Sequence, residues 1–275
     1  MAMVAVIGAP QAGATVASLA LALAWPGPSL LVDADLDVSP VRCGLLQSQF
    51  GGEFGLMHLG TAQRQGALEQ TLQTQLVNIA DRKGPARLML LGLTDPAQAG
   101  AVEYAWEPLA AALARIAADP QQPDVLVDLG RGGLAGRHAA LARSADILLF
   151  VARGSLAGVA AAHPRATRLD EDLRGAPGLT PEKRLLIVES GGANRYAGGE
   201  VAKNLGLTAA GQLPQDAKTA AWLSDGGHEP RGVRRSALLS AATATARSLL
   251  AVVAERNARI GPPMLDLSGV EALRG

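Results

Sequence analysis

Residues 3–23 read MVAVIGAPQAGATVASLALAL, and they predict the first strand, loop and helix of an α/β protein. The short apolar run at 4–7 predicts a strand that is buried on both faces. The run at 16–24 is rich in Ala and Leu and lacks Gly and Pro, so it predicts a buried helix. A glycine-containing loop at 8–15 joins the two, which gives a strand, loop and helix in that order.

The loop has the frame of a phosphate-binding loop, G-x-x-x-x-G-K-[ST]. Gly8, Gly13 and Thr15 stand at its fixed positions, but Ala14 takes the place of the lysine. In such loops backbone N–H groups and the helix N-terminus surround the phosphates, the lysine neutralises their charge, and the hydroxyl holds magnesium. Taken alone, the loop leaves two readings open: a phosphate site without its cation, and a tight turn between a strand and a helix.

Two later strands end in carboxylates. Residues 30–37, LLVDADLD, place Asp33 and Asp35 after one strand, and residues 124–130, DVLVDLG, place Asp128 after another. Ligands of open α/β sheets bind beyond the carboxyl ends of the strands, so these acids are expected at the same edge as the loop. The alternatives are ordinary solvated loop carboxylates for the first pair and a helix cap for Asp128.

The order and spacing of these motifs resemble those of the ParA/MinD family of deviant Walker-type ATPases. In that family a glycine loop opens the chain, and strands ending in D-x-D and in a single Asp follow. Residues 213–216, LPQD, are similar to the family's late I-P-x-D turn, so the resemblance covers about residues 1–255. It implies a P-loop NTPase-like fold.

The resemblance also implies a role for each matching residue. Thr15, Asp33 and Asp128 would hold Mg²⁺, and Asp35 would orient the attacking water. The residues that would contact ATP or ADP are Gly8, Gln11, Ala12, Gly13, Ala14, Thr15, Val16, Asn194, Pro214 and Asp216. For Pro214 and Asp216, a turn without a ligand is an equally open reading.

Two alanines depart from the family's pattern. Ala9 and Ala14 fall where the family has lysines, of which the first reaches the partner subunit's nucleotide and the second binds phosphate. Their presence predicts weak binding of ATP or ADP and Mg²⁺, and hydrolysis that is slow or absent. We expect a homodimer that depends little on ATP, unless an arginine such as Arg42 or Arg131 compensates.

The rest of the chain alternates strands and helices, which predicts an α/β fold with a single doubly wound, mostly parallel sheet flanked by helices on both faces. Strands are expected at 3–8, 29–33, 87–92, 124–129, 146–151, 184–189 and 209–213. Helices are expected at 14–24, 64–80, 97–118, 135–143, 155–173, 197–205 and 234–257, with a loop-rich switch region at 38–60. One domain is expected over residues 1–258, followed by a tail at 259–275.

The composition argues against several classes of protein. The 25 acidic and 25 basic residues give no net charge, so no global field drives nucleic-acid or membrane binding. Cys43 is the only cysteine and the four histidines are scattered, so neither a disulfide framework nor a zinc site is expected. The sequence shows no targeting segment and no apolar run near the ~20 residues that span a bilayer, which predicts a cytoplasmic protein.

The densest basic cluster comprises Arg231, Arg234, Arg235 and Arg247. A solvated helix start is favoured for it over a DNA-binding surface, because so few phosphate contacts bind DNA only weakly. Residues 262–274 carry two acids against one arginine, unlike the basic membrane-binding helix of MinD relatives, so no membrane anchor is expected.

Three functions remain. The first is a positioning or scaffold protein with weak or absent ATP hydrolysis, similar to the MinD-like branch that includes the TadZ/CpaE pilus-localisation proteins. Its protein partners would belong to a localised assembly at the septum, the pole or the pilus machinery. The second is an active ParA-type ATPase in DNA partitioning, which the missing lysine disfavours. The third is a dimerisation or adaptor module without nucleotide, which the retained Thr15 and acids disfavour.

Overall fold

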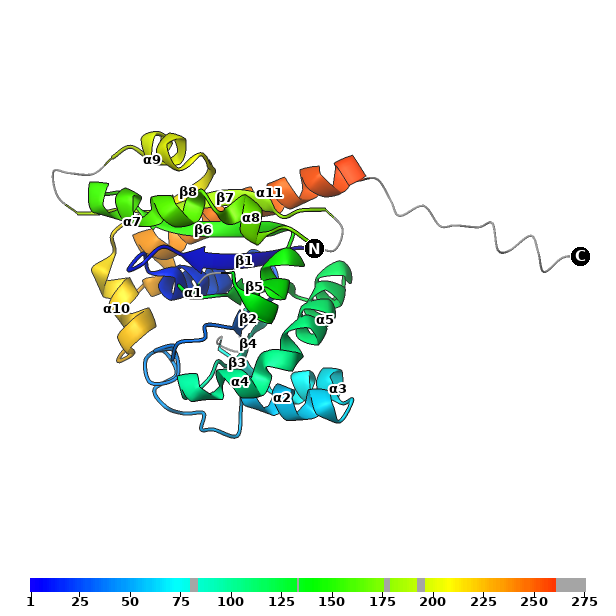
Figure 1. Cartoon of the computed structure of the whole chain (residues 1–275). Helices are drawn as coiled ribbons and strands as arrows, with labels where there is room; N and C mark the ends of the chain where they lie inside the picture. Colours follow the sequence, from blue (N-terminus) through cyan, green and yellow to red (C-terminus); the bar gives the residue numbers. More distant parts are fainter. Residues whose placement is uncertain (80–83, 133, 176–178, 192–195, 261–275) are drawn as a thin grey trace, which may run out of the picture.

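The computed structural model describes residues 1–79, 84–132, 134–175, 179–191 and 196–260, which form an eight-stranded sheet with helices on both faces (Figure 1). In sheet order the strands are β3 (Leu76–Asn78), β4 (Arg87–Leu90), β2 (Ser29–Asp33), β5 (Asp124–Asp128), β1 (Met3–Gly8), β6 (Ile147–Arg153), β7 (Glu182–Val188) and β8 (Thr208–Leu213). Neighbouring strands are parallel except for β3 and β4. The predicted doubly wound, mostly parallel sheet is confirmed.

The centre of the sheet explains the long apolar runs in the sequence. Strand β1 lies between β5 and β6, and every residue of β1, β2 and β5 is buried. Strands covered by helices on both faces need apolar side chains in both directions, so continuous rather than alternating hydrophobicity marks them. These are also the strands whose carboxyl ends carry the loop and the acids.

Helices fill two layers. Helix α1 (Ala14–Ala24) contacts α10 (Ala217–Asp225) and α11 (Ala237–Ile260). On the other face α5 (Trp106–Ala118) and α6 (Ala139–Arg143) contact β1, and α7 (Leu156–Ala166) contacts β6 and α9 (Gly198–Leu205). The shorter elements are α2 (Leu56–Arg64), α3 (Leu68–Thr74), α4 (Ala99–Val102), α8 (Leu169–Asp172) and the 3₁₀ turns η1 (Pro96–Gln98), η2 (Glu103–Ala105), η3 (Gly136–His138) and η4 (Val233–Arg235).

The prediction of a single helix at 64–80 was wrong. Helix α2 ends at Arg64, Gly66 follows with a φ of +70°, and α3 begins at Leu68. A glycine in the left-handed region ends a helix readily because it has no Cβ to clash. Beyond α3 the chain pairs antiparallel with β4 as β3, because the hydrogen bonds of an open sheet edge compete with helix formation.

The other observed helices differ less from the predicted ones. The helix expected at 97–118 is divided into η1, α4, η2 and α5, and the one expected at 155–173 is divided into α7 and α8. Helix α2 begins inside the region expected as loops at 38–60. Helix α10 was not predicted, since it is short and follows a proline-containing turn. The final helix begins at Ala237 rather than 234, after the turn η4.

A hydrogen-bonded group ties the first helix to the sheet. Trp25, just after α1, donates from Nε1 to Asp124 Oδ2 at 2.8 Å, and the Ala2 N–H donates to Asp124 Oδ1 at 2.7 Å. Arg87 donates to the carbonyls of Trp25 and Gly27. All these groups lie at the amino ends of the strands, so the carboxyl ends remain available for a ligand.

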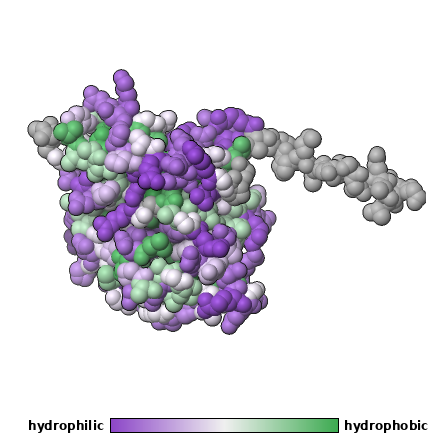
Figure 2. Space-filling model, viewed as in Figure 1, coloured by the Kyte–Doolittle hydropathy of each residue, from purple (hydrophilic) through white to green (hydrophobic). Residues whose placement is uncertain are grey.

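Among the described residues, one helix is long and apolar enough to cross a membrane by length and composition alone, at 237–259 with a mean hydropathy of 1.6. No such run was expected. The helix contacts α1 and β8, and four of its buried residues, Ala242, Ala246, Leu249 and Val253, form one stripe. The face of the molecule seen in Figure 2 mixes hydrophilic and hydrophobic residues.

Candidate phosphate and metal site

The loop between β1 and α1 is shaped by two glycines. Gly13 has a φ of +80° and caps α1. A Cβ on Gly8 would lie 2.8 Å from the Cβ of Ala14, which is closer than real Cβ atoms approach. Gly8 therefore lets the start of the helix lie against the end of the strand, and Gly13 supplies the left-handed residue that the turn needs.

The backbone of the loop is held by the neighbouring strands. The Gly8 N–H donates to Gly130 O and the Ala9 N–H donates to Val151 O, both at 2.9 Å. Within the described chain, the N–H groups of Gly13, Ala14 and Thr15 make no hydrogen bond. Free N–H groups at the positive end of a helix attract anions, so the backbone part of a phosphate site is present.

The loop's own side chains bring no cation. Ala9 and Ala14 are buried, at 3% and 8% exposure, and the methyl group of Ala14 faces Gly8. Ala12 is also buried, with its N–H donating to Ala9 O at 3.1 Å, and Val16 is half-buried in the first turn of α1. A phosphate here would meet N–H dipoles and the Thr15 hydroxyl.

The predicted acids come together beside the loop. Strands β2 and β5 are neighbours, and Asp33 and Asp128 are direct partners in their register. Both are almost fully buried, at 2% and 1% exposure, and Asp35 follows at 9%. The sheet edge thus carries three carboxyl groups close to the N-terminus of α1.

Asp128 faces the first turn of the helix. Its Oδ1 accepts from the Gly130 N–H at 3.0 Å. Burial raises the pKa of Asp128 to about 6, although the Gly130 N–H and the hydroxyls of Thr15 and Ser18 act in the opposite direction. The carboxyl group and the loop hydroxyl therefore share one site, as a metal centre requires.

Asp33 is the most perturbed of the three. Burial raises its pKa to about 7, with the charge of Asp128 adding to the effect and the Ser39 hydroxyl opposing it. Its Oδ1 has no hydrogen-bond partner in the described structure, and a Cβ on Gly92 would lie 2.7 Å from the carboxyl group. A buried carboxylate oxygen without a donor is costly unless a proton or a cation satisfies it.

Asp35 lies against the turn that follows β5. A Cβ on Gly130, whose φ is +61°, would fall 2.0 Å from the Asp35 carboxyl carbon, so only glycine leaves room for this acid. Asp35 Oδ1 accepts from the Asp37 N–H at 3.0 Å, and burial raises its pKa. Asp37 itself forms an ion pair with Arg131 at 3.2 Å.

The residues present fit a magnesium ion that keeps water and phosphate ligands. Among the described residues, no group of three His, Cys, Asp or Glu side chains is arranged to hold a metal by itself. Mg²⁺ binds through one or two protein oxygens and completes its shell with water and phosphate oxygens. Thr15, Asp128 and the unpartnered Asp33 Oδ1 supply such oxygens, and the bound ion would supply positive charge at the phosphates.

The residues expected near a nucleotide base are less informative. Asp216 caps α10, accepting from the Thr219 N–H at 3.1 Å and from its hydroxyl at 2.8 Å. Burial alone would raise the Asp216 pKa, but these hydrogen bonds lower it overall. Pro214 precedes this cap in the turn after β8. Asn194 lies outside the described residues, so its role stays a prediction.

The two arginines named as substitutes for the lysine are engaged elsewhere. Arg42 donates to the carbonyls of Phe50, Gly51, Phe54 and Gly92, and Arg131 pairs with Asp37. The sequence reasoning missed Arg153 and Arg165, which donate to Gln11 O and Gly8 O at 2.7 and 2.6 Å. Arg153 ends β6, so its position at the carboxyl end of a strand was a usable signal.

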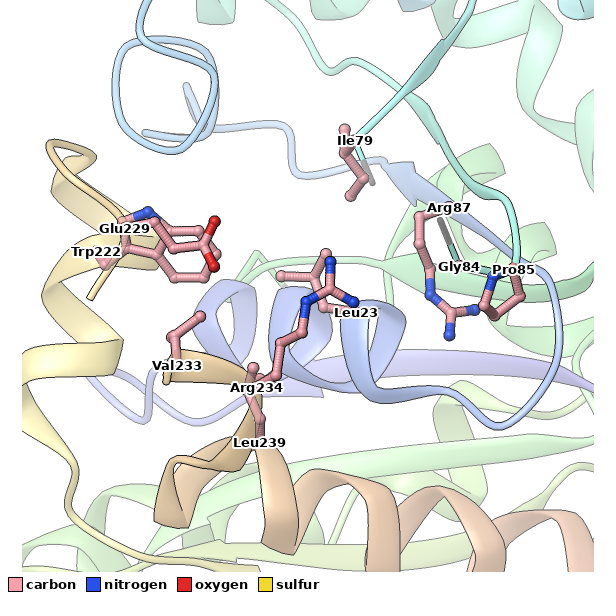
Figure 3. A pocket seen from close by; sticks show the side chains of 10 residues that line it. All are labelled: Leu23, Ile79, Gly84, Pro85, Arg87, Trp222, Glu229, Val233, Arg234 and Leu239. Carbon is pink, nitrogen blue, oxygen red and sulfur yellow. The ribbon is translucent and has the colours of Figure 1, made fainter. Parts of the chain in front are cut away.

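A separate cavity lies at the other end of α1 (Figure 3). Leu23, Arg87, Trp222 and Arg234 are among the residues that line its volume of about 110 Å³. Ligand pockets are typically several times larger, so this cavity does not compete with the loop as a nucleotide site.

Solved structures with the same fold are numerous, although no family model and no curated protein matches the chain. A ParA family ATPase from Chlorobium tepidum has 15% identity and a TM-score of 0.68, over 90% of this chain and 98% of that one. The septum site-determining protein MinD from Pyrococcus horikoshii, complexed with Mg-ADP, has 14% identity and a TM-score of 0.66, over 90% and 94%. A plasmid partition protein from Borrelia burgdorferi bound to AMPPNP has 9% identity and a TM-score of 0.60, over 93% and 99%. At these identities the similarity shows the fold that the chain shares with ParA and MinD ATPases.

Proposed function

We propose that this chain is a cytoplasmic positioning or scaffold protein of the ParA/MinD type that binds nucleotide weakly and hydrolyses it slowly or not at all. The similar structures belong to proteins named for septum-site determination and plasmid partition, so a role in the spatial organisation of a cellular assembly follows naturally. The altered loop is compatible with the TadZ/CpaE-like branch that the sequence resembles.

The observation that carries the proposal is the combination at the N-terminus of α1. The helix start leaves the N–H groups of Gly13, Ala14 and Thr15 free, and the acid pair Asp33 and Asp128 lies beside the loop hydroxyl. Both alanines that replace the family's lysines are buried. The elements that bind a phosphate and Mg²⁺ are thus retained, while the charge that stabilises phosphoryl transfer is missing from the loop.

The chemistry follows from this arrangement. Backbone N–H groups stabilise phosphate in the ground state and the transition state alike, which favours binding over turnover. The lysine of an ordinary loop acts on the charge of the transferred group, and loss of such a contact commonly costs about 3 kcal/mol of transition-state stabilisation. Asp35 can still orient a water, but without the lysine the step would be slow.

Two alternative functions would require features that this structure provides poorly or leaves unexplained. An active DNA-partitioning ATPase would need turnover and a basic surface, and the exposed Arg231, Arg235 and Arg247 provide little positive charge for the latter. A nucleotide-free adaptor would have no use for the buried, unpartnered Asp33 Oδ1 beside Asp128. We propose a homodimer that forms with or without ATP, because Ala9 cannot make the contact across subunits that a lysine makes in the family.

Isothermal titration tests the proposal. ATP and ADP should bind with weak affinity in the presence of Mg²⁺, and binding should weaken markedly when EDTA removes the ion. Asp128→Asn should reduce the Mg²⁺ dependence, whereas Asp225→Asn, a change at an exposed carboxyl at the end of α10, should not. Absence of binding to any nucleotide would favour the adaptor, and tight binding coupled to rapid turnover would favour the partitioning ATPase.

A further inference from the structure

The pairing of β6 with β1 places an arginine beside the loop. Gly8 is the register partner of Val151, and the Ala9 N–H donates to Val151 O. Strand β6 ends two residues later at Arg153, which therefore lies next to the loop and not in the helices that follow. Its Nε donates to Gln11 O at 2.7 Å.

The two arginines that contact the loop differ in their exposure and in how many N–H donors are free to bind a ligand. Arg165 comes from α7, is half-buried, and donates from Nη1 to Gly8 O at 2.6 Å. Arg153 is exposed, and Nε is the only nitrogen of its guanidinium that has a hydrogen bond to the described residues. A guanidinium carries five N–H donors, so four N–H groups of the exposed Arg153 remain available.

A buried acid gives an independent sign of a ligand at this site. Asp33 Oδ1 is unpartnered at 2% exposure, and its register partner Asp128 accepts from the Thr15 hydroxyl of the loop. A cation bound there would in turn attract an anion to the free N–H groups of the helix start. The loop then needs one more positive group on its open side, because its own residues supply none.

We propose that the guanidinium of Arg153 is that group: it contacts the phosphates of a polyphosphate held on the loop 8–15, in the place of the missing lysine. The inference rests on the proposed function, since it requires a phosphate at this loop. The Nε bond to Gln11 O holds the side chain against the loop and leaves the Nη groups free to contact a phosphate. Arg165 is a positioning residue that holds the Gly8 carbonyl.

The test compares binding of Mg-ATP, inorganic pyrophosphate and adenosine by titration calorimetry on the full chain. Arg153→Gln should weaken Mg-ATP and pyrophosphate binding by about ten- to a hundredfold, the range for a charge-assisted hydrogen bond. Adenosine binding should not change. Arg153→Lys should recover part of the affinity because it keeps the charge but loses the planar fork. Arg247→Gln, which removes an exposed arginine on α11, is the matched control.

Each outcome of this experiment either supports or overturns the proposed role of Arg153. Loss of Mg-ATP and pyrophosphate binding in Arg153→Gln, with recovery in Arg153→Lys, supports the inference. Unchanged binding in Arg153→Gln overturns it and leaves the proposed function standing. An equal loss for adenosine would show that the arginine only shapes the loop, which also overturns it. If the wild-type chain binds neither Mg-ATP nor pyrophosphate, the proposed function and this inference fail together.

Discussion

Replacing Asp33 with asparagine should make the protein more stable at high pH and not at low pH. The side chain is buried at 2% exposure, and its pKa is raised from 3.8 to about 7 by burial and by the charge of Asp128. Between these values the unfolded chain has released the proton and the folded chain has kept it. The folded form therefore loses stability as the pH rises through this window.

The magnitude follows from the same two values. One pKa unit corresponds to 1.36 kcal/mol, so the penalty for ionising Asp33 in the folded chain reaches about 4 kcal/mol above pH 7. Near pH 4 the group is only about half ionised in the unfolded chain, so the penalty is small there, and it vanishes at lower pH. The difference in unfolding free energy between Asp33→Asn and the wild type should grow by that amount between pH 4 and pH 8.

Urea unfolding followed by tryptophan fluorescence measures this difference, in buffers that contain EDTA to remove divalent ions. Taking the difference between the two proteins cancels the titration of groups that do not interact with Asp33. Asp225→Asn serves as the control, because it changes an exposed carboxyl at the end of α10. A difference between Asp33→Asn and the wild type that is the same at pH 4 and pH 8 would contradict a raised pKa of Asp33 in the folded chain.

Three further expectations concern the loop, the core and assembly. Ala14→Lys should raise the affinity for Mg-ATP by about tenfold or more in titration calorimetry, since it restores a charged phosphate contact; an unchanged affinity would mean that the loop does not hold phosphate as a Walker loop does. Trp25→Phe should lower the unfolding free energy by about 1–3 kcal/mol in urea, because Asp124 loses a 2.8 Å donor in a buried site; an unchanged free energy would contradict the role given to this bond. Analytical ultracentrifugation should find the same oligomeric state with and without Mg-ATP, and a monomer that dimerises only with ATP would contradict the lysine argument.

The central elements could be predicted because local pattern and tertiary context agree there. The bounds of β1, α1 and β2 match the expected 3–8, 14–24 and 29–33. Uninterrupted apolar runs mark the strands, and Pro26 fixes the end of the helix because proline cannot continue it. The structure of region 64–80 could not be predicted in the same way. Strand β3 forms by pairing with β4, and the leucines of this region fit a helix equally well.

The acids of the site could be placed from sequence because parallel strands end at one edge. The register partnership of Asp33 with Asp128 confirms their proximity. Arg165 could not be placed from the sequence, because it reaches Gly8 only through the way α7 lies on the sheet. The helix cap formed by Asp216 could not be predicted either, because the sequence of α10 has no strong hydrophobic periodicity.

A steady-state phosphate-release assay measures whether the altered loop supports ATP hydrolysis. The wild-type protein with Mg-ATP should release phosphate slowly or undetectably, with or without added DNA, and Asp35→Ala should show the same background. Turnover comparable to that of ATPases with an intact lysine, abolished in Asp35→Ala, would contradict the account of a nucleotide-binding scaffold with a disabled loop.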